Sequence, residues 1–145
     1  MGWLSRLREW ATRDPVGQVD DDLLGPLTLS DSCWEARVAV GGEQVCFRIG
    51  GRYTPDAALI THARDILRGF SRFDADIAAF LRAEADREAW AVFAEEIRSL
   101  KIRDICLFWP GRPDDGMIFF DGPDECRCWR CDYVERTPAG LGFDS

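Results

Sequence analysis

CWEARVAVGGEQVCFRIG, residues 33–50, contains two runs of alternating apolar and polar side chains that are joined by a pair of glycines. This pattern is typical of a β-hairpin with a two-residue turn. Such a turn pairs Val38 with Val45, and it places Glu35 opposite Arg48 as a favourable cross-strand ion pair. A shift by one residue would set apolar against polar side chains along the hairpin, so the register is strongly specified.

After the hairpin, apolar residues recur every three or four positions, which predicts helices. TPD, residues 54–56, is typical of a helix start with threonine as the N-cap, and this helix is expected to run to about Phe70. Ser71 with Asp74 resembles a capping box and predicts a second helix. A third apolar stripe follows over residues 90–100, either as a separate helix or as the end of one long bent helix.

Strand patterns return after Lys101. Residues 105–109 are apolar on both faces, which is typical of a central strand covered on both sides. Residues 117–120 (MIFF) and 126–136 (CRCWRCDYVER) predict two further strands, and a weaker one is expected around residues 23–29, where Gly-Pro interrupts it. The order predicts an α+β fold: an antiparallel sheet of about six strands, in strands–helices–strands order, with two or three helices packed on it.

The N-terminus predicts a separate element. Residues 1–14 have apolar side chains at helical spacing and indicate a short amphipathic helix, followed by a linker over residues 15–22 and a single domain over residues 23–145. Such a helix docks on its own domain or on a second subunit, so a homodimer formed through it is one prediction.

The composition restricts the classes of partner. The chain has 145 residues, a formal net charge of −8 and an isoelectric point near 4.6. An acidic surface disfavours nucleic acid, whose phosphates need a basic face, and it suits a cationic partner or simple solubility. No apolar run reaches the ~20 residues that span a bilayer, and the N-terminus lacks a signal-peptide pattern. These features predict a cytoplasmic protein, and one lysine against seventeen arginines suggests a bacterial source.

CRCWRC, residues 126–131, raises the question of a metal site. In a strand, Cys126 and Cys128 share one face, whereas Cys131 points to the other face with Trp129 and Tyr133. Zinc requires four ligands that converge on one point, which three cysteines on two faces do not supply. We therefore expect a strand with Cys131 as a small buried side chain, no bound metal and no cofactor.

Two kinds of residue remain as candidates for chemistry. The only histidine, His62, lies on the flank of a predicted helix, where a partly exposed or locally hydrogen-bonded imidazole is the usual arrangement. Carboxylates occupy the two turns that flank the MIFF strand and form at least two groups, one at each end of it. They are Asp114, Asp115, Asp121, Asp124 and Glu125. Aspartate is common in turns, but these groups also suit partner binding, oxygen ligation of a hard cation or acid–base chemistry.

The sequences IRDICLFWP and DGMIFFDGPDECRCWRCDY resemble the C-terminal part of small uncharacterised bacterial α+β proteins, which are grouped as domains of unknown function. The resemblance covers about residues 23–144 and implies a strands–helices–strands architecture. Relatives of similar architecture occur among immunity proteins that neutralise secreted toxins. The resemblance implies no catalytic residues.

Two functions are consistent with these features. The first is a non-enzymatic, immunity-like binding protein of the bacterial cytoplasm that presents the turn carboxylates to a basic protein partner. The alternative is a metal-dependent enzyme that uses the carboxylates around residues 114–125. A divalent ion bound by several of these oxygens would distinguish the second function from the first.

Overall fold

The computed structural model describes residues 17–145, which form one eight-stranded sheet and a helical segment. Four strands precede the helices and four follow them. The strands are β1 (Gln18–Asp21), β2 (Gly25–Ser30), β3 (Cys33–Val40), β4 (Glu43–Ile49), β5 (Lys101–Leu107), β6 (Gly116–Asp121), β7 (Cys128–Val134) and β8 (Thr137–Asp144).

The strands lie side by side in sequence order, from β1 at one edge to β8 at the other. All neighbouring pairs are antiparallel except β4 and β5, which are parallel. The prediction of an antiparallel sheet of about six strands is therefore wrong. The sheet is mixed because β5 begins at the same end of the sheet as β4. The helical segment carries the chain back to that end, as the crossover between two parallel strands requires.

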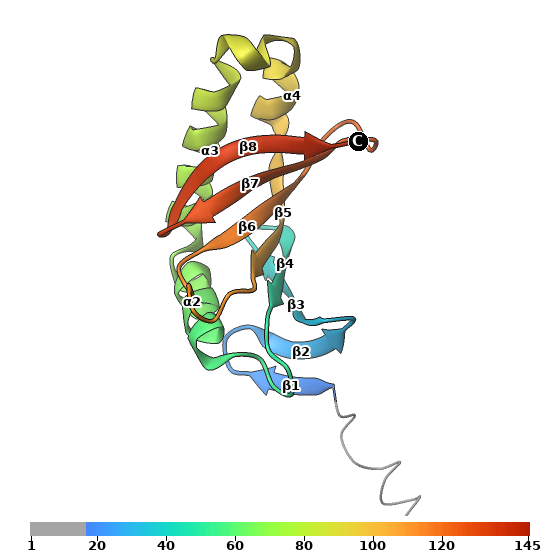
Figure 1. The fold of residues 1–145 in the computed structure, drawn as a ribbon, viewed down its shortest axis with the longest axis vertical. Helices are drawn as coiled ribbons and strands as arrows, with labels where there is room; N and C mark the ends of the chain where they lie inside the picture. Colours follow the sequence, from blue (N-terminus) through green and yellow to red (C-terminus); the bar gives the residue numbers. More distant parts are fainter. Residues whose placement is uncertain (1–16) are drawn as a thin grey trace, which may run out of the picture.

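The helices are α2 (Ala57–Arg68), α3 (Phe70–Ala85), the short 3₁₀ helix η1 (Glu88–Phe93) and α4 (Ala94–Ser99). Asp56, rather than Thr54, is the N-cap of α2, and its carboxylate accepts hydrogen bonds from the amides of Ala58 and Leu59. In the view of Figure 1, α3 and α4 pass behind β7 and β8. The helices thus cover one face of the sheet.

The core lies between this face and the helices. Its largest fully buried side chains come from the sheet and from α2, α3 and α4. They are Trp34, Trp129, Phe47, Phe120, Leu27, Ile49, Leu59, Ile77, Ile97, Ile105, Leu107 and Ile118. On β3 to β5, the other face of the sheet carries charged residues and cysteines instead.

The β3–β4 hairpin has the predicted register. Val38 pairs with Val45 and Glu35 with Arg48, and the Arg48 Nη1 to Glu35 Oε1 distance is 2.6 Å. The turn glycines have φ angles of +56° and +82°, which side-chain-bearing residues rarely adopt. Both the alternation of side chains and the turn are thus confirmed.

Two strands were not predicted from the sequence. Part of the expected linker over residues 15–22 is the edge strand β1, and the C-terminal TPAGLGFD forms β8 at the opposite edge. The predicted N-terminal helix over residues 1–14, and with it the homodimer through that helix, lies outside the described residues. None of the helices in residues 17–145 is both long and apolar enough to cross a membrane.

Candidate functional site

Asp114 and Asp115 lie in the turn between β5 and β6, where they hold the neighbouring β7–β8 turn. The carboxylate of Asp115 accepts a hydrogen bond of 2.9 Å from the amide of Glu135. That of Asp114 accepts one of 2.8 Å from Nε of Arg136. Glu135 and Arg136 have φ angles of +50° and +63°, so they form a tight turn without glycine. The two carboxylates stabilise this turn.

Asp121, Asp124 and Glu125 lie at the opposite end of β6, so the five turn carboxylates form two groups, as the sequence predicted. Nη2 of Arg127 lies 2.9 Å from the carboxylate of Asp124, which also accepts a hydrogen bond from the amide of Cys126. Asp121 is 68% exposed and lies 3.8 Å from Nη1 of Arg103. These interactions leave Asp121 and Glu125 largely facing solvent.

The fold adds two further carboxylates to this second group. Lys101, the only lysine in the chain, bonds to Glu43 of the hairpin at 2.7 Å. The same lysine is the cross-strand neighbour of Asp121. Hydrogen bonding to Glu43, with a smaller contribution from Asp74 of α3, raises the pKa of Lys101. We call Glu43, Asp74, Asp121, Asp124 and Glu125 the acidic end of the sheet.

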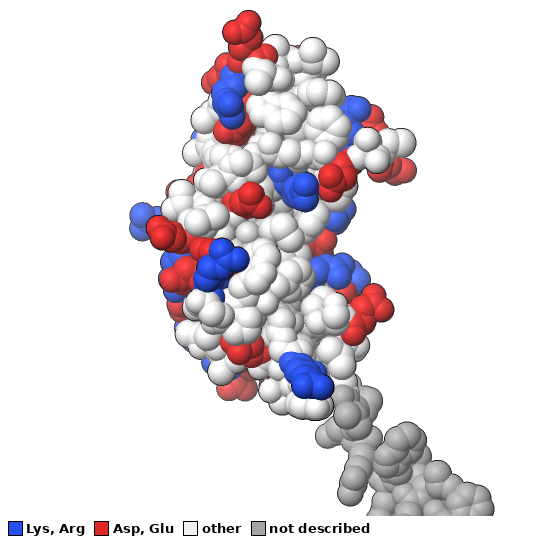
Figure 2. Space-filling view, in the orientation of Figure 1, with Lys and Arg blue, Asp and Glu red and all other residues white. Residues whose placement is uncertain are grey.

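A shallow groove runs beside these carboxylates, lined in part by Glu43, Ser99, Lys101, Asp121 and Pro123. One lysine therefore stands among three carboxylates drawn from the hairpin, α3 and β6. In the view of Figure 2, positive and negative side chains are interspersed, so no single large charged area covers that side of the molecule.

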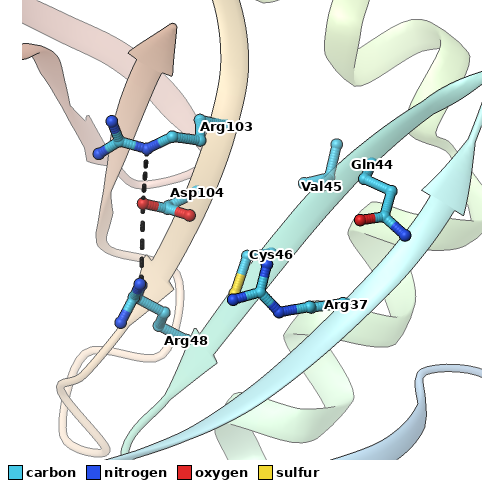
Figure 3. A pocket seen from close by; sticks show the side chains of 7 residues that line it. All are labelled: Arg37, Gln44, Val45, Cys46, Arg48, Arg103 and Asp104. Atoms are coloured by element: carbon cyan, nitrogen blue, oxygen red, sulfur yellow. Dashed lines mark hydrogen bonds and ion pairs between the residues drawn. The ribbon is translucent and has the colours of Figure 1, made fainter.

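A second hollow lies on the face of β3, β4 and β5 that the helices leave uncovered, and Figure 3 shows it with the helices behind the strands. We call it the arginine hollow. Its volume is about 230 Å³, and it is lined by Arg37, Gln44, Val45, Cys46, Arg48, Arg103 and Asp104. Three arginines and one carboxylate thus surround a small cavity in a protein whose net charge is −8.

Asp104 organises this hollow. Its side chain is 9% exposed and lies between two arginines (Figure 3), with Oδ2 3.0 Å from Nε of Arg103 and 3.7 Å from Nε of Arg48. Glu35 holds Arg48 from the other side. Arg37 makes no ion pair or hydrogen bond with any residue between 17 and 145. Two guanidinium groups are therefore held by carboxylates, and that of Arg37 has no partner in the part of the chain that the structure describes.

His62 is buried on α2, so the prediction of a partly exposed or locally hydrogen-bonded imidazole is wrong. The side chain is 2% exposed, and neither ring nitrogen has a hydrogen-bond partner in the described chain. Its ring stacks on that of Tyr133 of β7 at 5.9 Å, and Nδ1 lies 3.7 Å from a carboxylate oxygen of Asp114. Burial, helped by the positive charge of Arg136, lowers the pKa of His62 below its usual 6.5.

We expect this histidine to make folding sensitive to pH below about 7. The unfolded chain binds a proton at His62 more readily than the folded chain, so the free energy of unfolding should fall as pH drops below 6.5. One proton contributes at most about 1.4 kcal/mol per pH unit. Urea denaturation of the natural protein and of His62→Phe should show a smaller pH slope for the variant. Equal slopes would assign the pH dependence to other groups.

The three cysteines of CRCWRC do not converge. Cys131 is buried on the core face with Trp129 and Tyr133, whereas Cys128 lies on the opposite face, so the predicted alternation is confirmed over β7. Cys126 was predicted in the strand, but it lies exposed in the preceding turn. Between residues 17 and 145, no three His, Cys, Asp or Glu side chains are grouped so that they could hold a metal ion.

Comparisons with family models, curated proteins and solved structures found no match to this chain. The resemblance to small uncharacterised bacterial proteins and to immunity proteins therefore stays a prediction. The geometry of the acidic end and of the arginine hollow is what bears on function.

Proposed function

We propose that this protein acts by binding a basic protein partner in the bacterial cytoplasm, and that it is not an enzyme. The observation that carries the proposal is the acidic end. There the fold brings Glu43 and Asp74 close to Lys101, whose cross-strand neighbour is Asp121 at the end of β6, so that one lysine faces several carboxylates. Surface charges of one sign attract an opposite charge over long distances and speed encounter.

The turn carboxylates contribute unequally to this surface. Asp114 and Asp115 bind the β7–β8 turn, and Asp124 pairs with Arg127. The main role of these three carboxylates is therefore to stabilise the fold. Asp121, Glu125, Glu43 and Asp74 are the carboxylates that a partner would meet. A basic secreted toxin is one partner class that suits such a surface, in which case the protein would be an immunity protein.

The alternative of a metal-dependent enzyme using residues 114–125 gains no support from the geometry. Its carboxylates lie at opposite ends of β6, and arginines lie within 3.6 Å of three of them, Asp114, Asp115 and Asp124. A hard cation needs several oxygens within a few ångströms of one point.

Association with the partner should slow by about tenfold when the acidic end is neutralised by Glu43→Gln, Asp74→Asn and Asp121→Asn together. The rate for the natural protein should fall steeply with added salt, while dissociation changes less. Affinity capture from the native host supplies the partner, and stopped-flow fluorescence measures both rates at several salt concentrations.

The matched control neutralises three other exposed acids by Asp31→Asn, Asp76→Asn and Glu135→Gln, none of which forms an ion pair within residues 17–145. Its net charge equals that of the first variant. Equal slowing by both variants would assign the effect to net charge and reject the acidic end as the site. A substrate turned over by the protein, with loss of turnover in Asp121→Ala, would reject the binding function itself.

A further inference from the structure

We propose that the arginine hollow binds a small phosphoryl oxyanion, either inorganic phosphate or a phosphomonoester. This site is separate from the acidic end and does not depend on the partner proposed above. The inference starts from the charges of the lining: three arginines, from β3, β4 and β5, and a single carboxylate, Asp104, line a hollow of about 230 Å³, with Arg48 and Arg103 around Asp104 and Arg37 beside Cys46 in Figure 3.

The hollow exists because of the order of side chains across the sheet. Arg37, Cys46 and Asp104 are direct neighbours on three adjacent strands. The short cysteine side chain between two longer ones leaves space, and Cys46 forms a floor that is only 6% exposed. Burial raises the pKa of the Cys46 thiol, so the floor is uncharged at neutral pH. Charged side chains therefore line the sides of the hollow, and the uncharged thiol of Cys46 lies at its base.

Two of the arginines are positioned before any ligand arrives. Asp104 contacts Nε of both Arg48 and Arg103, and these contacts fix the directions of the two side chains. Immobilising an arginine side chain on ligand binding costs conformational entropy. The ion pairs with Asp104 already order Arg48 and Arg103 in the folded protein, so less entropy is lost when a ligand binds. Nη1 of Arg48 is held by Glu35, so an incoming oxygen would be bound by the other N–H groups of this guanidinium.

Of the three arginines that line the hollow, Arg37 is the one without a counter-charge among residues 17–145. It is exposed and has no acidic partner among residues 17–145, although acids outnumber basic residues in the chain by 26 to 18. Its guanidinium extends alongside Cys46 in Figure 3. An oxyanion in the hollow would give Arg37 the paired N–H···O contacts that a guanidinium fork favours.

The number of acceptor oxygens, rather than the net charge, favours a phosphoryl group over a single carboxylate. Arg48 already pairs with Glu35 and Arg103 with Asp104. The three arginines still line one hollow, and a phosphoryl group presents three acceptor oxygens to their N–H groups where a carboxylate presents two. The acids that surround the hollow, among them Glu35 and Asp121, repel a long polyanion such as nucleic acid.

The test titrates the full chain with inorganic phosphate at pH 7.5 and constant ionic strength, and follows the backbone amide and arginine Nε–Hε signals by NMR. Glycerol phosphate forms a second arm, which distinguishes a phosphomonoester from free phosphate by its affinity. Arg37→Gln should weaken phosphate binding at least about tenfold, as loss of a charge-assisted hydrogen bond predicts. Arg82→Gln changes an arginine on α3 that is also exposed and has no ion pair in the described chain, and it should leave binding unchanged.

Saturable shifts confined to β3, β4 and β5, lost in Arg37→Gln and kept in Arg82→Gln, would support the site. Identical shifts with sodium chloride, or equal weakening by both variants, would overturn it, because the effect would then be screening of surface charge. Acetate binding as tightly as phosphate would replace the phosphoryl assignment by a carboxylate site. Binding only of a phosphorylated peptide would likewise reject a small-molecule site in favour of a peptide surface.

Discussion

Replacing Trp129 by alanine should lower the free energy of unfolding by about 3–5 kcal/mol. Trp129 is fully buried in β7, and its ring lies 4.8 Å from that of Phe143 and 5.7 Å from that of Phe93. These partners come from β8 and from η1, so one side chain joins the C-terminal edge of the sheet to the helical segment. Since whole domains are stable by only about 5–15 kcal/mol, the variant should be close to unfolding at room temperature.

The polar end of Trp129 belongs to a second set of contacts. Its Nε1 donates to Glu96 of α4 at 3.2 Å, and Glu96 also accepts hydrogen bonds from Nε and Nη2 of Arg127. The guanidinium of Arg127 lies over the ring of Phe93 at 5.1 Å. The N–H of Trp129 therefore satisfies a carboxylate that is only 11% exposed.

Two further variants separate these contributions. Trp129→Phe keeps an aromatic ring in the cluster but loses the hydrogen bond to Glu96 and the extra volume of the indole, so it should cost about 1–3 kcal/mol, less than Trp129→Ala. Val92→Ala truncates an apolar side chain of η1 that is 91% exposed, and it should change stability by no more than about 0.5 kcal/mol. Urea denaturation followed by far-ultraviolet circular dichroism measures all three. A loss below 1.5 kcal/mol in Trp129→Ala would contradict its role as a central core residue.

Strands with regular alternation could be predicted from the sequence, and strands that depend on their neighbours could not. The β3–β4 hairpin has both alternation and a glycine turn, and its register is confirmed pair by pair. β8 has a proline and two glycines and reads as a loop. It becomes a strand because β7 supplies its hydrogen bonds and because Leu141 and Phe143 pack against the core.

The direction of β5 also depended on tertiary structure. Its apolar run predicted a central strand, and β5 does lie between two other strands. Such runs are common in parallel strands, so the pattern contained a signal for the parallel pair. The direction itself follows from how the helical segment crosses the sheet, which no local pattern specifies.

The acidic end and the arginine hollow also differ in how far the sequence could predict them. The turn carboxylates were visible in the sequence because they flank one short strand. The arginine hollow was not, because Arg37, Arg48 and Arg103 meet only through the register of three strands. His62 was misjudged for a related reason, since Tyr133, which is distant in sequence, stacks on its ring.

Replacing Gly51 by alanine should destabilise the fold by about 3 kcal/mol or more, as backbone strain and steric overlap add. Gly51 follows β4 with a φ angle of +146°, and an added Cβ would lie 2.1 Å from the carbonyl oxygen of Thr54. Two hydrogen bonds depend on the tight loop that follows β4. The amide of Asp56, the N-cap of α2, donates to the carbonyl of Gly50 at 2.9 Å, and the carbonyl of Gly51 accepts from the indole of Trp34 at 3.2 Å.

Gly42→Ala is the matched control, because Gly42 also has a positive φ angle, +82°, but no atom lies within 4 Å of its added Cβ. It should therefore cost only the left-handed backbone conformation, about 1–2 kcal/mol. The difference between the two variants in urea denaturation measures what Gly51 adds to a glycine in an ordinary left-handed turn, namely its overlap with the start of α2 and its wider φ angle. Equal destabilisation by both would mean that the loop after β4 can rearrange, and that the N-cap of α2 does not depend on the close approach of Gly51 to Thr54.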